Sequence, residues 1–140
     1  MTTRKIPFID IQSADHHEIG YAIGRALKEK IHEYWEWLWK LYELRSNAST
    51  LGDLAKETGL YINKYFPQYY QELAGIAEGA EIDLEKIALI CDEEMIMHHL
   101  QARCTSIAIS SGETVLLAHN EDWAPGYEDC LYVVRVRNDE

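Results

Sequence analysis

The chain has little basic charge, few cysteines and no long apolar run. Its 13 Lys and Arg residues face 24 Asp and Glu residues, which gives a formal net charge of −11. This acidic excess argues against binding to nucleic acid or to an anionic membrane surface, because both need clustered Lys and Arg. No apolar segment approaches the ~20 residues that a membrane-spanning helix requires. We therefore expect a protein that contacts neither nucleic acid nor membrane.

The cysteines are three in number, Cys91, Cys104 and Cys130, and no two of them form a CxxC pair. Such a set argues against a disulfide scaffold and against a zinc ribbon, and no spacing of ligands indicates a metal site. Residues 1–20 lack the basic stretch and the apolar stretch of a secretory signal. A cytoplasmic protein is the expectation. Its apolar share of 47% is that of a globular chain with a buried core.

The first half of the chain predicts a strand and a long helix. Residues 5–11 (KIPFIDI) alternate like a short strand, and Ser13 is a suitable N-cap for a helix that ends near residues 46–47. Gly20 and Gly24 lie four residues apart on this helix, a spacing that usually marks the close approach of another backbone. The apolar stripe of the helix steps by three or four residues through Ile19, Ile23, Leu27, Ile31, Trp35 and Leu38.

Three further helices and then strands are expected. The helices are residues 51–65, residues 67–79 and a segment that Asp83 caps and that continues through Cys91. After residue 101 the apolar period changes to two, which is typical of strands, in residues 104–110, 114–120 and 131–137. We predict an α+β fold in which these three strands form an antiparallel sheet with open edges.

A hairpin turn at Ser111–Gly112 brings chemically useful residues together. The turn places the start of the strand 104–110 beside the end of the strand 114–120. A two-residue loop sets Cys104 opposite His119, whereas a three-residue loop sets it opposite Asn120, with Asp122 on the same face. The sequence leaves the register open, and a slip by one residue reverses the faces.

A thiol at this place has three interpretations. Cys104 can act with His119 as a base, in a Cys–His hydrolase. It can instead become N-terminal by cleavage of the preceding peptide bond, so that its own α-amino group is the base. Asp122 could then hold that amino group. The third interpretation is a small apolar residue at the start of a strand, which is the commonest role of a free cysteine.

Four stretches of the sequence resemble a known family. They are KIPFIDI with HEIGYAIGRALKEKI (17–31), ELAGIAEGAEIDLEKIALI (72–90), RCTSIAI (103–109) and AHNEDW (118–123). In order and spacing they are similar to the acyl-coenzyme A:6-aminopenicillanic acid acyltransferase family, which is related to choloylglycine hydrolases and penicillin V acylases. The resemblance covers essentially the whole chain.

The resemblance implies a precursor that cuts itself between Arg103 and Cys104. Residues 1–103 would be a mainly helical segment with a short N-terminal strand. Residues 104–140 would begin the nucleophile-bearing part of an αββα N-terminal-nucleophile hydrolase fold.

The resemblance also assigns roles to residues. Cys104 would be the nucleophile and its α-amino group the base, Asp122 would orient that group, and Asn120 would support the site. The implied chemistry is hydrolysis or transfer of acyl groups on non-peptide linear amides, with an acyl-coenzyme A thioester as a further substrate. No metal or organic cofactor is implied.

Two positions depart from the family, and part of the family pattern is expected beyond Glu140. Arg103 stands where the acyltransferase has Gly, and His119 stands where bile-salt-type relatives have Arg, which argues against that substrate class. The Asn that helps to form the oxyanion hole is expected downstream. Because an oxyanion donor is worth about 10²–10³ in rate, we expect the isolated chain to be inactive.

An alternative hypothesis, from another functional class, is that the chain is a non-catalytic interaction module. Its acidic helices would bind a partner, and its short sheet would complete the sheet of another chain. Open sheet edges also predict self-association, because an unpaired strand edge offers free backbone groups to a second chain.

Overall fold

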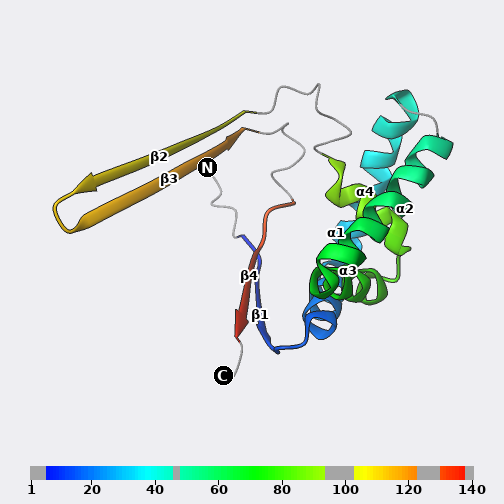
Figure 1. Ribbon diagram of the computed structural model, residues 1–140, viewed down its shortest axis with the longest axis horizontal. Helices are drawn as coiled ribbons and strands as arrows, with labels where there is room; N and C mark the ends of the chain where they lie inside the picture. The colour runs from blue at the N-terminus through cyan, green and yellow to red at the C-terminus, as the bar shows by residue number, and fades with distance from the viewer. Residues whose placement is uncertain (1–5, 46–47, 94–102, 123–129, 138–140) are drawn as a thin grey trace.

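The computed structural model describes residues 6–45, 48–93, 103–122 and 130–137 (Figure 1). Apart from one strand near the N-terminus, helices precede strands in these residues, which confirms the α+β class. The αββα layering remains a prediction. In chain order the elements are β1 (Phe8–Gln12), α1 (His16–Arg45), α2 (Ala48–Tyr65), α3 (Pro67–Ala80), α4 (Leu84–Cys91), β2 (Arg103–Ser111), β3 (Thr114–Asp122) and β4 (Val133–Arg137).

The N-terminus of α1 is capped two residues later than the sequence predicts. Oδ1 of Asp15 accepts the backbone N–H of Glu18 at 2.9 Å, which is the contact of an N-cap residue. The hydroxyl of Ser13 supports this turn, since it accepts the N–H of Asp15 at 3.1 Å and donates to the Glu18 carboxylate at 2.8 Å. Asp15 therefore replaces Ser13 as the N-cap, because both side chains suit the position and the helix begins at His16.

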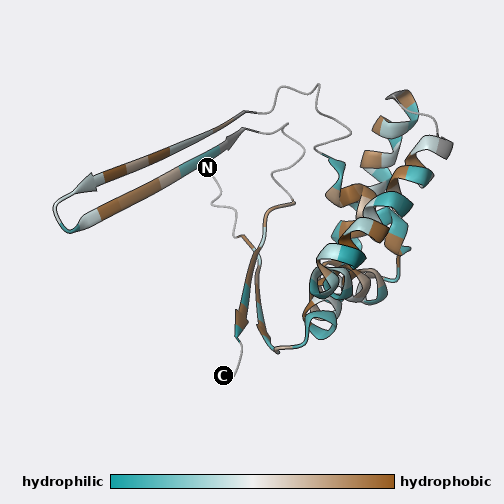
Figure 2. Cartoon of the chain, in the orientation of Figure 1, coloured by the Kyte–Doolittle hydropathy of each residue, from teal (hydrophilic) through white to brown (hydrophobic). Residues whose placement is uncertain are grey.

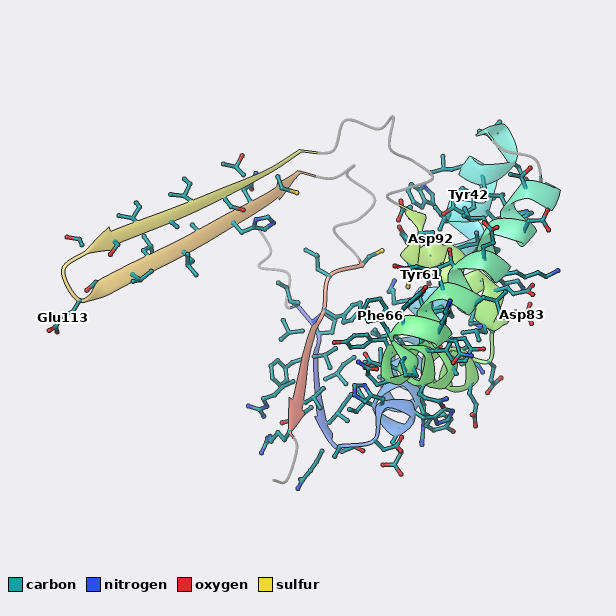
Figure 3. The ribbon with its side chains drawn as sticks, in the orientation of Figure 1. Tyr42, Tyr61, Phe66, Asp83, Asp92 and Glu113 are labelled. Carbon is teal, nitrogen blue, oxygen red and sulfur yellow. The ribbon has the colours of Figure 1, made fainter. Side chains whose placement is uncertain are left out.

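The apolar stripe of α1 serves two separate clusters. At its N-terminal half the stripe packs against Ile11 of β1, with Val134 of β4 beside it. At its C-terminal half Leu38 and Tyr42 are completely buried against residues of α2 and α4. The Tyr42 hydroxyl, which is labelled in Figure 3, donates to the carbonyl oxygen of Leu89 at 2.8 Å. One long helix thus holds the small sheet at one end and the other helices at the other.

The close backbone approach predicted from Gly20 and Gly24 is confirmed. A Cβ atom built on either glycine would overlap a backbone carbonyl oxygen of α3. The contact is reciprocal, because a Cβ on Gly75 or Gly79 of α3 would overlap backbone carbonyl oxygens of α1. Two Gly-xxx-Gly pairs therefore let the helices cross with their backbones in contact, at a distance that any side chain would prevent.

The predicted three-stranded antiparallel sheet is wrong. The described strands form two separate pairs, the antiparallel hairpin β2–β3 and the parallel pair β1–β4, in which Phe8 lies beside Val133. The strand predicted at 131–137 pairs with β1 and not with the hairpin, because Val134 packs into the apolar cluster that Ile11 of β1 forms with α1. On the outer face of this pair, the Asp10 carboxylate accepts hydrogen bonds from the guanidinium groups of Arg135 and Arg137.

Candidate functional site

The hairpin β2–β3 carries the candidate nucleophile. Gly112 has a φ of +59° and begins the two-residue loop that Glu113 completes at the hairpin tip (Figure 3). A glycine with positive φ at the first loop position is typical of a type II′ turn, which matches the twist of the flanking strands. Cys104 is the second residue of β2, at the end of the hairpin away from the turn.

The observed register differs from both registers considered from the sequence. The loop is Gly112–Glu113 and not Ser111–Gly112, so Cys104 lies opposite Glu121. It lies opposite neither His119 nor Asn120. The shift arises because Gly112 takes the left-handed position at the start of the turn, and Ser111 stays paired with Thr114 in the ladder.

This register divides the candidate residues between the two faces of the hairpin. Cross-strand partners share a face and faces alternate along a strand. Cys104 therefore shares its face with His119, two pairs further along the ladder, whereas Asn120 and position 122 belong to the opposite face with Thr105 and position 103. The sequence-level expectation that Asn120 or Asp122 shares the face of Cys104 does not hold in this hairpin. For Arg103 and Asp122 the structure describes the backbone positions alone.

Ser106 joins the constellation, and the sequence interpretation missed it. Ser106 lies directly opposite His119, and its hydroxyl oxygen is 2.9 Å from Nδ1 of the imidazole. Either atom is the donor, depending on the tautomer of His119. The face that carries Cys104 therefore also carries a hydrogen-bonded Ser–His pair. The signal available in the sequence was the spacing of two residues between Cys104 and Ser106, which places both on one face of a strand.

The three cysteines have different surroundings. Cys104 is exposed, as is every other described side chain from residue 104 to residue 120, and Cys130 is half-buried. Cys91 is also exposed in surface area, but the atoms around its thiol desolvate it and, with the Asp92 carboxylate, raise its pKa to about 11. At neutral pH the Cys91 thiol is therefore protonated and a poor nucleophile.

Figure 1 shows the hairpin extending away from the helices, and Figure 2 shows apolar segments along both of its strands. Among the residues that the structure describes, no group of three or more His, Cys, Asp or Glu side chains has the arrangement of a metal site. In the same part of the chain, no helix is both long and apolar enough to cross a membrane. Cys104, Ser106 and His119 share one face of this hairpin.

Comparison with known proteins gives relatives that act in acyl and amide chemistry. One is a β-alanyl-dopamine/carcinine hydrolase of Drosophila melanogaster, 29% identical, with 76% of this chain matched. Another is the 40 kDa form of acyl-coenzyme A:6-aminopenicillanic-acid acyltransferase of Emericella nidulans, 28% identical, also with 76% of this chain matched. These similarities confirm the resemblance to the acyl-coenzyme A:6-aminopenicillanic acid acyltransferase family.

The matches cover most of this chain but a much smaller share of each relative. The chain spans about a third, 31%, of the length of each of these curated relatives. No family model matches the chain. The similarity thus concerns about a third of each of these two relatives.

Proposed function

We propose that Cys104 is the nucleophile of an enzyme that hydrolyses or transfers acyl groups of non-peptide linear amides. Residues 1–140 supply the N-terminal part of that enzyme and are inactive alone. The observation that carries the proposal is the similarity of most of this chain to both a hydrolase and an acyltransferase. A cysteine nucleophile serves both reactions, because the same thioester can pass its acyl group to water or to an amine.

The reaction proceeds through an acyl-thioester. The Cys104 thiolate attacks the carbonyl carbon of the amide, the C–N bond breaks, and the amine leaves with the proton that the thiol lost. Water or an acceptor amine then attacks the thioester, gives up a proton and releases the thiol. With an acyl-coenzyme A donor, the bond that breaks in the first step is the C–S bond, and coenzyme A leaves as its thiol.

Cleavage between Arg103 and Cys104 supplies the base. The freed α-amino group of Cys104 has a reference pKa of roughly 7.7–8.0 and can exchange protons near neutral pH. In the hairpin, the residue opposite Arg103 is Asp122, one pair from Cys104. The α-amino nitrogen is a main-chain atom, so the assignment of Cys104 and Asp122 to opposite faces does not separate it from position 122. This arrangement supports Asp122 as the group that orients the amine.

A second candidate is a Cys–His hydrolase with His119 as base. The shared face of Cys104 and His119 and the contact of His119 with Ser106 favour it. This reaction needs no chain cleavage. His119→Ala should then abolish the reactivity of Cys104 at neutral pH, whereas the α-amino mechanism predicts a modest effect of the same substitution.

The test of the first proposal is the intact mass of the purified protein, fresh and after incubation at neutral pH. We expect two fragments that meet at Arg103–Cys104, and no cleavage in Cys104→Ala, with Cys130→Ala as the control that still cleaves. A single uncut mass, together with loss of thiol reactivity in His119→Ala, would replace the first mechanism by the second. Steady amidase activity of the 140-residue chain that Cys104→Ala abolishes would contradict the proposed inactivity.

A further inference from the structure

A cavity with two tryptophan side chains in its wall lies between α1, α2 and the N-terminal end of α4. Its volume is about 380 Å³, which falls in the ~300–1,000 Å³ range of small-molecule sites. Trp35 and Trp39 come from one face of α1, and their ring centroids lie 5.4 Å apart. Because Nε1 of Trp39 already donates to Oε1 of Glu43 at 2.8 Å, this ring offers the cavity an apolar surface.

The α2 side of this cavity is open at Gly52. A Cβ atom built on Gly52 would meet nothing within 4 Å, unlike one built on the glycines at the crossing of α1 with α3. A second cavity, of about 650 Å³, shares Asp83 and Glu85 with the first and continues along α2 past Gly59. The two cavities therefore adjoin and form one groove between α2 and α4.

The charged groups of the groove balance each other. Asp83 and Glu85 contribute two carboxylates to its described wall. Lys56 and Lys86 contribute two ammonium groups, although the chain as a whole has a net charge of −11. Nζ of Lys86 lies 2.9 Å from Oδ2 of Asp83, which is labelled in Figure 3, and 5.9 Å from the centre of the Trp35 ring. Hydrogen-bond donors and acceptors thus lie beside the aromatic surface, and a ligand of either charge gains little net attraction.

We propose that this groove binds a neutral sugar, with the C–H face of a pyranose ring on the tryptophan surface and the hydroxyl groups on the charged side chains. The C–H hydrogens carry partial positive charge, which suits the negative face of an aromatic ring. Hydroxyl groups donate to carboxylates and accept from ammonium groups, and such charge-assisted hydrogen bonds are strong. A purely apolar ligand would remove water from these charges without replacing it, which is costly.

Saturation-transfer NMR on the 140-residue chain measures this binding, because it detects the ring C–H protons of a bound sugar. Cellobiose is the probe, since both of its rings are neutral and have flat C–H faces. Caffeine is the control for stacking alone, because it is flat and neutral but has no hydroxyl group. Glycerol is the control for hydroxyl groups alone.

We expect cellobiose to bind with a Kd of about 1 mM, at least about threefold tighter than caffeine and glycerol. A smaller difference from either control, or no saturation transfer to cellobiose, would overturn the proposal. This comparison uses the wild-type protein and does not depend on the folding of a variant.

Gly52→Leu tests the place of binding. The new side chain enters the groove without a clash at Cβ and replaces a glycine inside a helix, so the variant should fold. We expect it to weaken cellobiose binding at least about tenfold. Thr50→Leu adds the same side chain at an exposed position of α2 outside both cavities and should bind as the wild type does. A smaller loss of binding in Gly52→Leu, or an equal loss in Thr50→Leu, would overturn the assignment of the sugar to this groove.

The sugar site and the reaction at Cys104 fail separately. The wall of the groove comes from the helices, and no residue of the hairpin β2–β3 contributes to it. Cellobiose binding therefore supports the site whether or not Cys104 forms a thioester. Cleavage at Arg103–Cys104, or its absence, gives no information on the groove.

Discussion

The crossing of α1 with α3 and the hairpin β2–β3 are built by opposite means. At the crossing, four glycines bring two helices into backbone contact, although the glycines of α1 lie more than fifty residues before those of α3 in the sequence. In the hairpin, strands that are neighbours in the sequence pair with each other, and Leu117, for example, remains 75% exposed. Each helix of the crossing needs a partner that is distant in the sequence, whereas the hairpin needs only the turn that joins its two strands.

The difference indicates where stability and where chemistry lie. Buried contacts between distant segments carry most of the free energy of folding, so the helices hold the molecule together. The exposed hairpin contributes little to that free energy, and its side chains are accessible to other molecules. The candidate nucleophile lies on this exposed hairpin.

The largest expected effect breaks the crossing. Gly24→Ala places a methyl group against the α3 backbone, and we expect a loss of about 3 kcal/mol or more in the free energy of unfolding. Urea denaturation followed by circular dichroism measures it. Gly59→Ala in α2 is the matched control, since nothing lies within 4 Å of the added Cβ, and it should stabilise the protein by about 0.5–1 kcal/mol. Equal effects of the two substitutions would contradict the crossing.

A smaller loss should follow removal of one buried hydroxyl. Tyr42→Phe leaves the Leu89 carbonyl oxygen without the donor at 2.8 Å, at a fully buried place, and should cost about 1–2 kcal/mol. The same urea titration applies. Tyr61→Phe, at an exposed position of α2, should change the free energy by less than about 0.5 kcal/mol. If the urea midpoint of Tyr42→Phe equalled that of the wild type, the buried hydroxyl would not contribute to the free energy of unfolding.

The pH dependence of stability tests the outer face of β1–β4. The guanidinium groups of Arg135 and Arg137 lower the pKa of Asp10 from its ordinary value of 3.8 to about 2. Because this pKa is lower in the folded state, the contribution of Asp10 is complete above about pH 4 and is lost as the pH falls towards 2. Unfolding midpoints of the wild type and Asp10→Asn should differ at pH 5 and converge near pH 2. A constant difference at all pH values would rule out the carboxylate as its source.

The smallest effect on stability is expected in the hairpin. Leu117→Ser should change the free energy of unfolding by less than about 0.5 kcal/mol, because the side chain is already exposed. It should instead reduce the self-association that we expect from open strand edges, measured by sedimentation velocity. A clear loss of stability would show that the hairpin packs against the rest of the chain in solution.

The helices were predictable because their signals are local. The apolar stripe of α1 and the spacing of Gly20 and Gly24 predicted a buried face and a close neighbour, and both are present. The sequence could not identify α3 as that neighbour. The partner of β4 was also beyond sequence reasoning, because strands of similar composition can pair with the nearest strand or with one more than a hundred residues away.

The candidate site residues came from the resemblance and stay a prediction, whereas the geometry of the hairpin that carries them was not predictable from the sequence. The resemblance selected Cys104, Asn120 and Asp122, but the face that each position occupies depends on a loop of two residues whose place differs by one from the predicted place. Because side chains alternate between the two faces of a strand, a shift of one residue in the pairing moves every position to the opposite face. Ser106 was missed because its spacing of two residues from Cys104 is a weak signal until its cross-strand partner His119 is known.

The parallel pairing of β1 with β4 has a consequence for a severed chain. Asp10 and Arg135 lie 125 residues apart in the sequence, yet they hydrogen-bond across this pair. A nick at any point between Cys91 and Val133 would therefore leave two polypeptides that still share a backbone ladder and an apolar cluster. We therefore expect the two pieces, produced separately, to associate through this pair and this cluster.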